Sequence, residues 1–252
     1  MVALLLLLTC WLAWAAPEVL VVGDEEKPLA ALGAFLGKHG HSFRYLDQAG
    51  YRARKPGPAP AAMMMYVHNT LDDDTEAALI SYTRQGGRLI ILHHGLASAR
   101  MRNKEILPFA GMVLMPRDST AHPWKVIWGD VEIVNLRPGH YVTSHNVRYD
   151  RTIAYTPSEG LSVEKRLPGF VLPDTEAYLN QLFSDARSKT VLLGFTCQCK
   201  EGTYTQDRAG WYLPVEKGHL FYFQQGHHAR DFDNPSFRQI ILNSLNWQPG
   251  QE

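Results

Sequence analysis

The sequence of 252 residues has no excess of either charge, no internal repeat and very few cysteines. Lysine plus arginine number 25, and aspartate plus glutamate also number 25, so no overall field attracts nucleic acid or an acidic membrane surface. We therefore expect no nucleic-acid partner. A small polar or neutral ligand suits this charge balance better.

The first seventeen residues, "MVALLLLLTCWLAWAAP", contain no charged side chain. The apolar run ends at Ala13-Trp14-Ala15, which has the small-x-small form of a signal-peptidase site. The pattern predicts a signal peptide over residues 1–15 and an exported protein, periplasmic or extracellular, with no membrane contact after cleavage. Against this prediction, no lysine or arginine precedes the run. An uncleaved membrane anchor remains the alternative, since the run is near the lower length limit for a spanning helix. A lipoprotein site at Cys10 is a weaker one, since Thr9 stands where a smaller residue is expected.

Removal of this leader leaves two cysteines, Cys197 and Cys199, in the strand-like segment "TVLLGFTCQCK". Alternation along a strand places both side chains on the same face. A disulfide across one intervening residue is possible in an exported protein but geometrically strained, so we expect two reduced, half-buried thiols. No further ligands follow at the spacing of a zinc site.

Apolar strands alternate with amphipathic helices along the first part of the chain. The strand segments are "EVLVVG", "SFRYL", "MMMYVH" and "RLIILHHG", and the helical ones are "PLAALGAFLGKHG" and "DDDTEAALISYTRQGG". This order is typical of a mainly parallel sheet covered on both faces. The middle of the chain reads as strands and long loops, and it is followed by antiparallel strands and a last helix, "NPSFRQIILNSLNW", with Asn234 as its cap and Pro235 in its first turn. We predict one α/β domain over residues 16–252 with an elaborated middle segment.

Histidines follow three of the predicted strands. His68 comes after the third strand, His93 and His94 end the fourth, and His227 and His228 follow the last. Ligands of open α/β sheets bind at the carboxyl ends of the strands, so these imidazoles are predicted to share one site. The alternative is that they are separate loop histidines.

Four segments resemble the trehalose-utilisation (ThuA-like) family: "GGRLIILHHG", "AHPW", "DTEAYLN" and "GHLFYFQQGHHARDFDNPSFRQIILNSLNW". The resemblance spans about residues 18 to 250. It implies a flavodoxin-like three-layer sandwich similar in fold to class I glutamine amidotransferases. The positions that match the family pattern are Leu92-His93, Glu176 to Tyr178 and Gly226-His227.

One further segment, "LRPGHYVTS", matches a second His-Pro element of the family at His140. Tyr141 stands in place of the proline, which leaves the role of His140 open.

Glutaminase chemistry requires a cysteine nucleophile on the tight turn after a strand. The corresponding turn here is His93-His94-Gly95, and the cysteines of the predicted mature chain lie elsewhere. We therefore expect no glutaminase activity.

Imidazole and carboxylate remain at the predicted edge, and they suit either general acid/base catalysis or a metal site. The candidate catalytic residues are His93, Glu176, Tyr178 and His227. His93, Glu176 and His227 are also candidate ligands of a divalent metal, for which zinc is the best choice, and the second histidine of each pair could replace the first. No nucleotide cofactor is expected. Alternatively, Glu176 and Tyr178 are a surface acid and a packed ring on a helix that Asp174 caps.

Aromatic residues are frequent in the irregular half of the chain, where loops would rim the site: Trp124, Trp128, Trp211, Tyr212 and Tyr222. Such rings stack on sugar faces, and they also fill cores. The resemblance implies disaccharide metabolism, so we expect an exported enzyme acting on a carbohydrate or keto-sugar derivative. The alternative is a non-catalytic carbohydrate-binding or accessory protein on the same fold.

Overall fold

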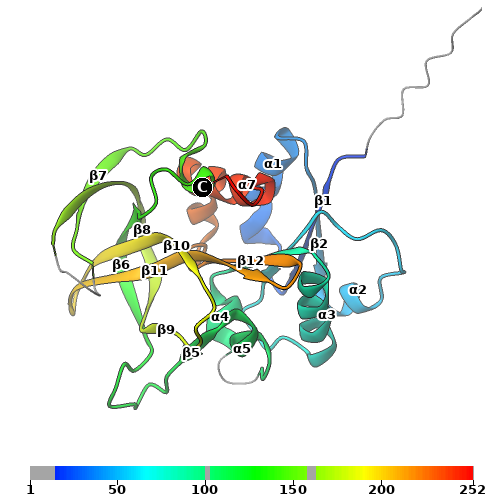
Figure 1. The fold of residues 1–252 in the computed structure, drawn as a ribbon, viewed down its shortest axis with the longest axis horizontal. Helices are drawn as coiled ribbons and strands as arrows, with labels where there is room; N and C mark the ends of the chain where they lie inside the picture. Colours follow the sequence, from blue (N-terminus) through cyan, green and yellow to red (C-terminus); the bar gives the residue numbers. More distant parts are fainter. Residues whose placement is uncertain (1–14, 100–102, 158–162, 252) are drawn as a thin grey trace, which may run out of the picture.

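The computed structural model describes residues 15–99, 103–157 and 163–251, so the predicted signal peptide lies outside the described residues apart from Ala15. Figure 1 shows the arrangement of the helices and strands. In chain order they are β1 (Glu18–Gly23), η1 (Lys27–Leu29), α1 (Ala30–Lys38), β2 (Ser42–Asp47), α2 (Gln48–Arg52), β3 (Ala62–Tyr66), α3 (Asp73–Arg84), β4 (Arg88–Leu92), α4 (His94–Ala99), α5 (Ile106–Ala110), β5 (Met112–Leu114), β6 (Lys125–Asn135), α6 (Tyr141–Ser144), β7 (Arg151–Tyr155), β8 (Lys165–Leu179), β9 (Gln181–Phe183), β10 (Thr190–Cys199), β11 (Gly202–Val215), β12 (Gly218–Phe223), η2 (Ala229–Asp233) and α7 (Pro235–Asn246).

A mixed sheet runs through the molecule in the order β2-β1-β3-β4-β12-β11-β10-β6-β8-β7. Strands β2, β1, β3, β4 and β12 pair in parallel, and β11, β10, β6, β8 and β7 pair antiparallel. The parallel half is the α/β unit that the alternating pattern predicts. The antiparallel half comes from the middle of the chain and from the segment before the last helix (Figure 1).

Helices cover both faces of the parallel half. Val19 and Val21 of β1 belong to the hydrophobic core shared with α1 and α7, whereas Leu20 and Val22 belong to the core shared with α3 and α5. Because successive side chains of a strand point to opposite faces, a fully apolar strand such as β1 requires a helix layer on each side. Figure 1 shows these two helix layers on either side of the sheet. The predicted three-layer α/β sandwich is confirmed.

The last helix begins where the sequence predicts it. The side chain of Asn234 accepts hydrogen bonds from the backbone N–H groups of Ser236 and Phe237, and Pro235 follows directly. Asparagine satisfies two otherwise unpaired N–H groups, and proline has no N–H group to lose. The segment that connects β12 to α7 therefore ends at the Asn234 cap.

The prediction for the cysteines is wrong. Cys197 and Cys199 lie on the same face of β10, as alternation requires, but they form a disulfide with their Cα atoms 5.7 Å apart. That separation is within the range that a disulfide spans. Cys197 is fully buried and Cys199 is half-buried.

The alternative that placed Glu176 and Tyr178 on a helix is also wrong, because both lie on β8. Asp174 therefore caps no helix. It has a φ of 44° beside an irregularity in the pairing of β6 with β8, and its N–H donates to Asp130 Oδ1 at 2.8 Å. Such an interruption of a ladder kinks the strand locally.

Candidate active site

His93 is held in an unusual backbone conformation directly after β4. Its φ is 44°, in the left-handed region, and its N–H donates to the carbonyl of Phe223 at 2.8 Å. The ring nitrogen Nδ1 lies 2.6 Å from the carbonyl oxygen of Gln224. A carbonyl can only accept, so Nδ1 carries the hydrogen and Nε2 offers its lone pair. Left-handed backbone at a non-glycine residue costs energy and is concentrated at functional sites.

The segment after β12 places His227 beside this imidazole. Gly226 precedes it with a φ of 107°, and a Cβ atom there would lie 2.6 Å from Cζ of Phe232. The hydroxyl of the buried Tyr66 donates to the Gly226 carbonyl at 2.9 Å. Only glycine fits this conformation and this contact without strain, so the approach of His227 depends on Gly226.

Glu176 and Tyr178 reach the same place from the antiparallel half. They are two residues apart on β8 and therefore share one face of the strand. The backbone N–H of Tyr178 donates to Gln224 Oε1 at 3.1 Å. In the sheet order, β11, β10 and β6 separate β8 from β12, which would place the two strands nearly 20 Å apart in a flat sheet. The sheet must therefore curve to bring β8 against the end of β12.

The predicted residues His93, Glu176 and His227 come together with His94. Glu176 Oε2 lies 2.8 Å from His227 Nδ1, 3.6 Å from His94 Nε2 and 3.8 Å from His93 Nε2. His93 Nε2 lies 2.9 Å from His227 Nδ1. One ligand atom from each of the four residues is within 4.8 Å of every other. We call these four residues the His-Glu cluster.

Burial and mutual contacts set the charges of this cluster. Burial alone would raise the pKa of Glu176, but the hydrogen bond from His227 and the nearby imidazoles of His93 and His94 outweigh it and hold that pKa well below its usual value. Burial, reinforced by the neighbouring imidazoles, lowers the pKa of His94 to about 2. Burial also lowers the pKa of His93. At neutral pH the cluster thus combines an ionised carboxylate at Glu176 with neutral imidazoles at His93 and His94.

Tyr178 supplies the proton donor of the site. Its side chain is fully buried, and its hydroxyl lies 3.0 Å from His93 Nε2. Burial, together with the nearby charge of Glu176, raises the pKa of Tyr178 well above its usual value. The phenol therefore keeps its proton and donates a hydrogen bond to the lone pair of His93 Nε2.

Asp24 was not predicted to belong to this edge. It follows β1, and its carboxylate accepts hydrogen bonds from the backbone N–H groups of His68 and Asn69 at 2.9 and 2.6 Å. Burial opposes ionisation, but the bonds from His68 and Asn69 lower the pKa of Asp24 to about 2. The His68 ring lies 4.1 Å from the His94 ring, centroid to centroid. The signal in the sequence was the acidic residue directly after "EVLVVG", at the same sheet edge as the histidines.

The sequence pattern of the trehalose-utilisation family, ThuA, matches residues 60–248. The chain belongs to the ThuA family. No curated protein matches it significantly in sequence.

Two ThuA-like proteins of known structure share this fold. One from Bacteroides uniformis has a TM-score of 0.59 at 16% identity, covering 92% of this chain and 91% of the other. One from Parabacteroides merdae has a TM-score of 0.59 at 11% identity, covering 92% and 89%. A glutamine amidotransferase from Thermotoga maritima gives a TM-score of 0.45 at 7% identity, covering 91% and 96%. At these identities the likeness of this ThuA chain to solved structures concerns the fold alone.

Trp128 lies at the exposed side of the ThuA site. It is directly opposite Glu176 in the pairing of β6 with β8, and its ring centroid is 4.8 Å from that of His227. The side chain is 47% exposed, which is unusual for tryptophan. Trp124 is buried and lies against Tyr178, with centroids 5.5 Å apart. Of the aromatic residues predicted to rim the site, Trp128 has the exposure that this role requires.

The other predicted rim residues are buried in the core. Trp211 and Tyr212 are at most 3% exposed, and Tyr222 is fully buried with its hydroxyl 3.4 Å from the carbonyl of His93. His140, whose role the sequence left open, caps α6 through its side chain and stacks on Trp247. His140 is therefore a structural residue outside the His-Glu cluster.

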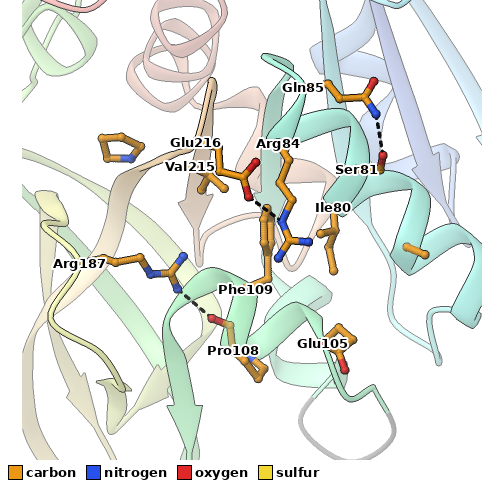
Figure 2. A pocket seen from close by; sticks show the side chains of 12 residues that line it. Ile80, Ser81, Arg84, Gln85, Glu105, Pro108, Phe109, Arg187, Val215 and Glu216 are labelled. Atoms are coloured by element: carbon orange, nitrogen blue, oxygen red, sulfur yellow. Dashed lines mark hydrogen bonds and ion pairs between the residues drawn. The ribbon is translucent and has the colours of Figure 1, made fainter.

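A separate hollow of about 740 Å³ lies at the opposite edge of the sheet, near the starts of β4 and β12 (Figure 2). Arg84 Nε lies 3.2 Å from Glu216 Oε1, and Arg187 donates to the carbonyl of Pro108 at 2.8 Å. These charges are paired with protein groups, as Figure 2 shows. No histidine is among the described residues that line this hollow. The His-Glu cluster is therefore the stronger candidate for an active site.

Proposed function

We propose that this ThuA protein is an exported enzyme that acts on a carbohydrate derivative, with a keto-sugar as the favoured class, at the His-Glu cluster. The observation that carries the proposal is the convergence of His93, Glu176, Tyr178 and His227 from three distant parts of the chain. Burying an ionised carboxylate is costly unless it is paired. A chain that needed only a stable core would gain little from placing these groups together.

The charges of the centre fit chemistry at a carbonyl. Glu176 and the imidazoles form an electron-rich site that can hold a cation, and the His227 ring in contact with Glu176 is the candidate proton acceptor. Tyr178 keeps its proton and can donate a hydrogen bond to an oxygen on which charge develops. A proton acceptor beside such a donor is the arrangement for proton transfer next to a carbonyl group.

The exposed ring of Trp128 supports a sugar as the ligand. Its indole is wide, flat and nearly half exposed beside His227, so a pyranose face could stack on it while a polar group reaches the cluster. The disulfide between Cys197 and Cys199 supports export, because disulfides persist in oxidising compartments. Glutaminase activity is not proposed, since His93 occupies the nucleophile turn.

Turnover of oxidised and unmodified disaccharides, followed by NMR, tests the proposal. His227→Ala is expected to lower turnover by about 100-fold or more while the melting temperature changes by only about a few degrees. His228→Asn is the matched control, because asparagine keeps a hydrogen-bond acceptor at the start of η2. Saturable sugar binding without product would favour the accessory, non-catalytic role. Equal turnover in His227→Ala and wild type would remove the cluster from the reaction.

A further inference from the structure

We propose that His93, His94, Glu176 and His227 together bind one divalent transition-metal ion, with zinc as the preferred ion. This inference deepens the proposed function and rests on the same site. It adds His94 to the three ligands that the sequence predicts. It is tested below by metal binding itself, so that its failure and the failure of the enzymatic proposal can be told apart.

The spacing of the four side chains is the first argument. Zinc–nitrogen and zinc–oxygen bonds are about 2.0–2.2 Å long, so the ligand atoms of a tetrahedral site lie about 3.4 Å from one another. The distances from Glu176 Oε2 to the three imidazoles are 2.8, 3.6 and 3.8 Å. The distance between His93 Nε2 and His227 Nδ1 is 2.9 Å. Shifts of under about 1 Å would bring these four separations to those of a tetrahedral site, and no two ligand atoms of the cluster are more than 4.8 Å apart.

His94 supplies the second argument, because its imidazole is left without a hydrogen bond. Its Nδ1 is buried and has no partner among the described residues, and its Nε2 lies 3.6 Å from Glu176 Oε2, beyond ordinary hydrogen-bond length. Buried polar groups are rarely unpaired, and each exception needs an explanation, of which ion binding is one. A metal ion bound at Nε2 would give that nitrogen the partner that the protein does not provide.

His93 has the outer contact typical of a metal ligand. Its Nδ1–H donates to the backbone carbonyl of Gln224, which fixes the ring and directs the Nε2 lone pair at the cluster. Histidine ligands commonly hold their second nitrogen this way. This one lone pair faces both the Tyr178 hydroxyl and His227 Nδ1, at 3.0 and 2.9 Å. The Tyr178 hydroxyl and His227 Nδ1 thus compete for a single lone pair. An ion bound to His93 Nε2 would remove this competition.

The donor set selects the kind of ion. Three imidazoles and one carboxylate are borderline ligands that favour zinc and its transition-metal neighbours over magnesium or calcium, which prefer oxygen. The carboxylate of the buried Glu176 would offset part of the ion's charge. Bound there, a metal would act as a Lewis acid only by taking a sugar carbonyl oxygen as a fifth ligand, an expansion that catalytic zinc sites make in the transition state.

Metal binding to the tag-free protein is the decisive measurement. The protein is stripped with a chelator, and zinc affinity and stoichiometry are measured by competition with a chromophoric chelator and by elemental analysis; cobalt absorption reports the coordination geometry. We expect one zinc per chain in the wild type. His94→Ala and Glu176→Gln should each weaken binding by about 100-fold, since even outer contacts of metal ligands matter 10- to 100-fold.

His228→Asn is the matched control, because His228 adjoins His227 but lies outside the cluster, and its affinity should equal that of the wild type. The inference is overturned if the stripped wild type takes up no zinc, or if His94→Ala and Glu176→Gln bind zinc as tightly as the wild type. Stoichiometric zinc without any sugar turnover would leave the metal site standing and remove the enzymatic proposal. A stripped wild type that takes up no zinc but still turns over the sugar would do the reverse.

Discussion

Replacing Gly226 by alanine perturbs the approach of His227 without touching any side chain of the His-Glu cluster. The residue has a φ of 107°, and the new Cβ atom would lie 2.6 Å from Cζ of the fully buried Phe232. The backbone strain costs about 1–2 kcal/mol, and the overpacking against Phe232 costs a further ~1–3 kcal/mol. We expect Gly226→Ala to lower the free energy of unfolding by about 2–5 kcal/mol.

Gly40→Ala separates the two contributions. Gly40 follows α1 with a φ of 85°, and nothing lies within 4 Å of the position of its Cβ, so only the backbone strain of about 1–2 kcal/mol should appear. Urea denaturation of both variants measures the difference. Adding Phe232→Leu to Gly226→Ala should recover part of the packing loss as a favourable coupling. Equal losses in Gly226→Ala and Gly40→Ala would refute the packing argument.

The remaining predictions concern the ligand, the pH dependence of stability, the excluded chemistry and export. Trp128→Ala should raise KM about fivefold, which corresponds to the loss of a stacking contact worth ~1 kcal/mol, while the free energy of unfolding stays almost unchanged. Trp128→Phe should keep most of the affinity. Equal KM values for Trp128→Ala and the wild type would exclude stacking. Asp24 has a folded pKa of about 2 against an ordinary 3.8, so its stabilising effect is complete above about pH 5 and is lost as the pH falls toward 2. The free energy of unfolding of the wild type should therefore be about 1–2 kcal/mol higher than that of Asp24→Asn at pH 6. Urea denaturation should show this difference in stability becoming smaller at lower pH; a difference that does not depend on pH would contradict the argument. Incubation with glutamine should release no ammonia; release that stops in Cys197→Ser would mean that the nucleophile had been misplaced. N-terminal sequencing of protein from the host should begin near Ala16, and intact Met1 in a membrane fraction would contradict cleavage.

The parallel half of the fold was predictable because local patterns determine it. Apolar runs such as those of β1 and β4 alternate with the helices α1 and α3, and the histidine positions follow directly from the strand ends. The meeting of His93 with His227 was predictable for the same reason, since β4 and β12 are parallel neighbours in the sheet.

The contribution of β8 could not be derived from periodicity. Glu176 lies far from β12 in the order of strands, and only the curvature of the antiparallel half brings it to the cluster. Glu176 was predicted as a site residue from the resemblance to the ThuA family and not from its position in a periodic pattern. The disulfide between Cys197 and Cys199 was missed because the sequence does not give the distance between the two Cα atoms, which is 5.7 Å in the strand and can be spanned by a disulfide. Trp211 and Tyr212 were placed at the rim because sequence position alone does not report burial.

Turnover of a keto-sugar by Glu176→Gln, compared with the wild type, tests the central claim most directly. Glutamine keeps the shape of the side chain but removes the negative charge that His227 and His93 contact. The account predicts that the wild type converts the sugar and that Glu176→Gln is at least about 100-fold slower while remaining folded. A folded Glu176→Gln variant that turns over the same sugar at the wild-type rate would contradict the account.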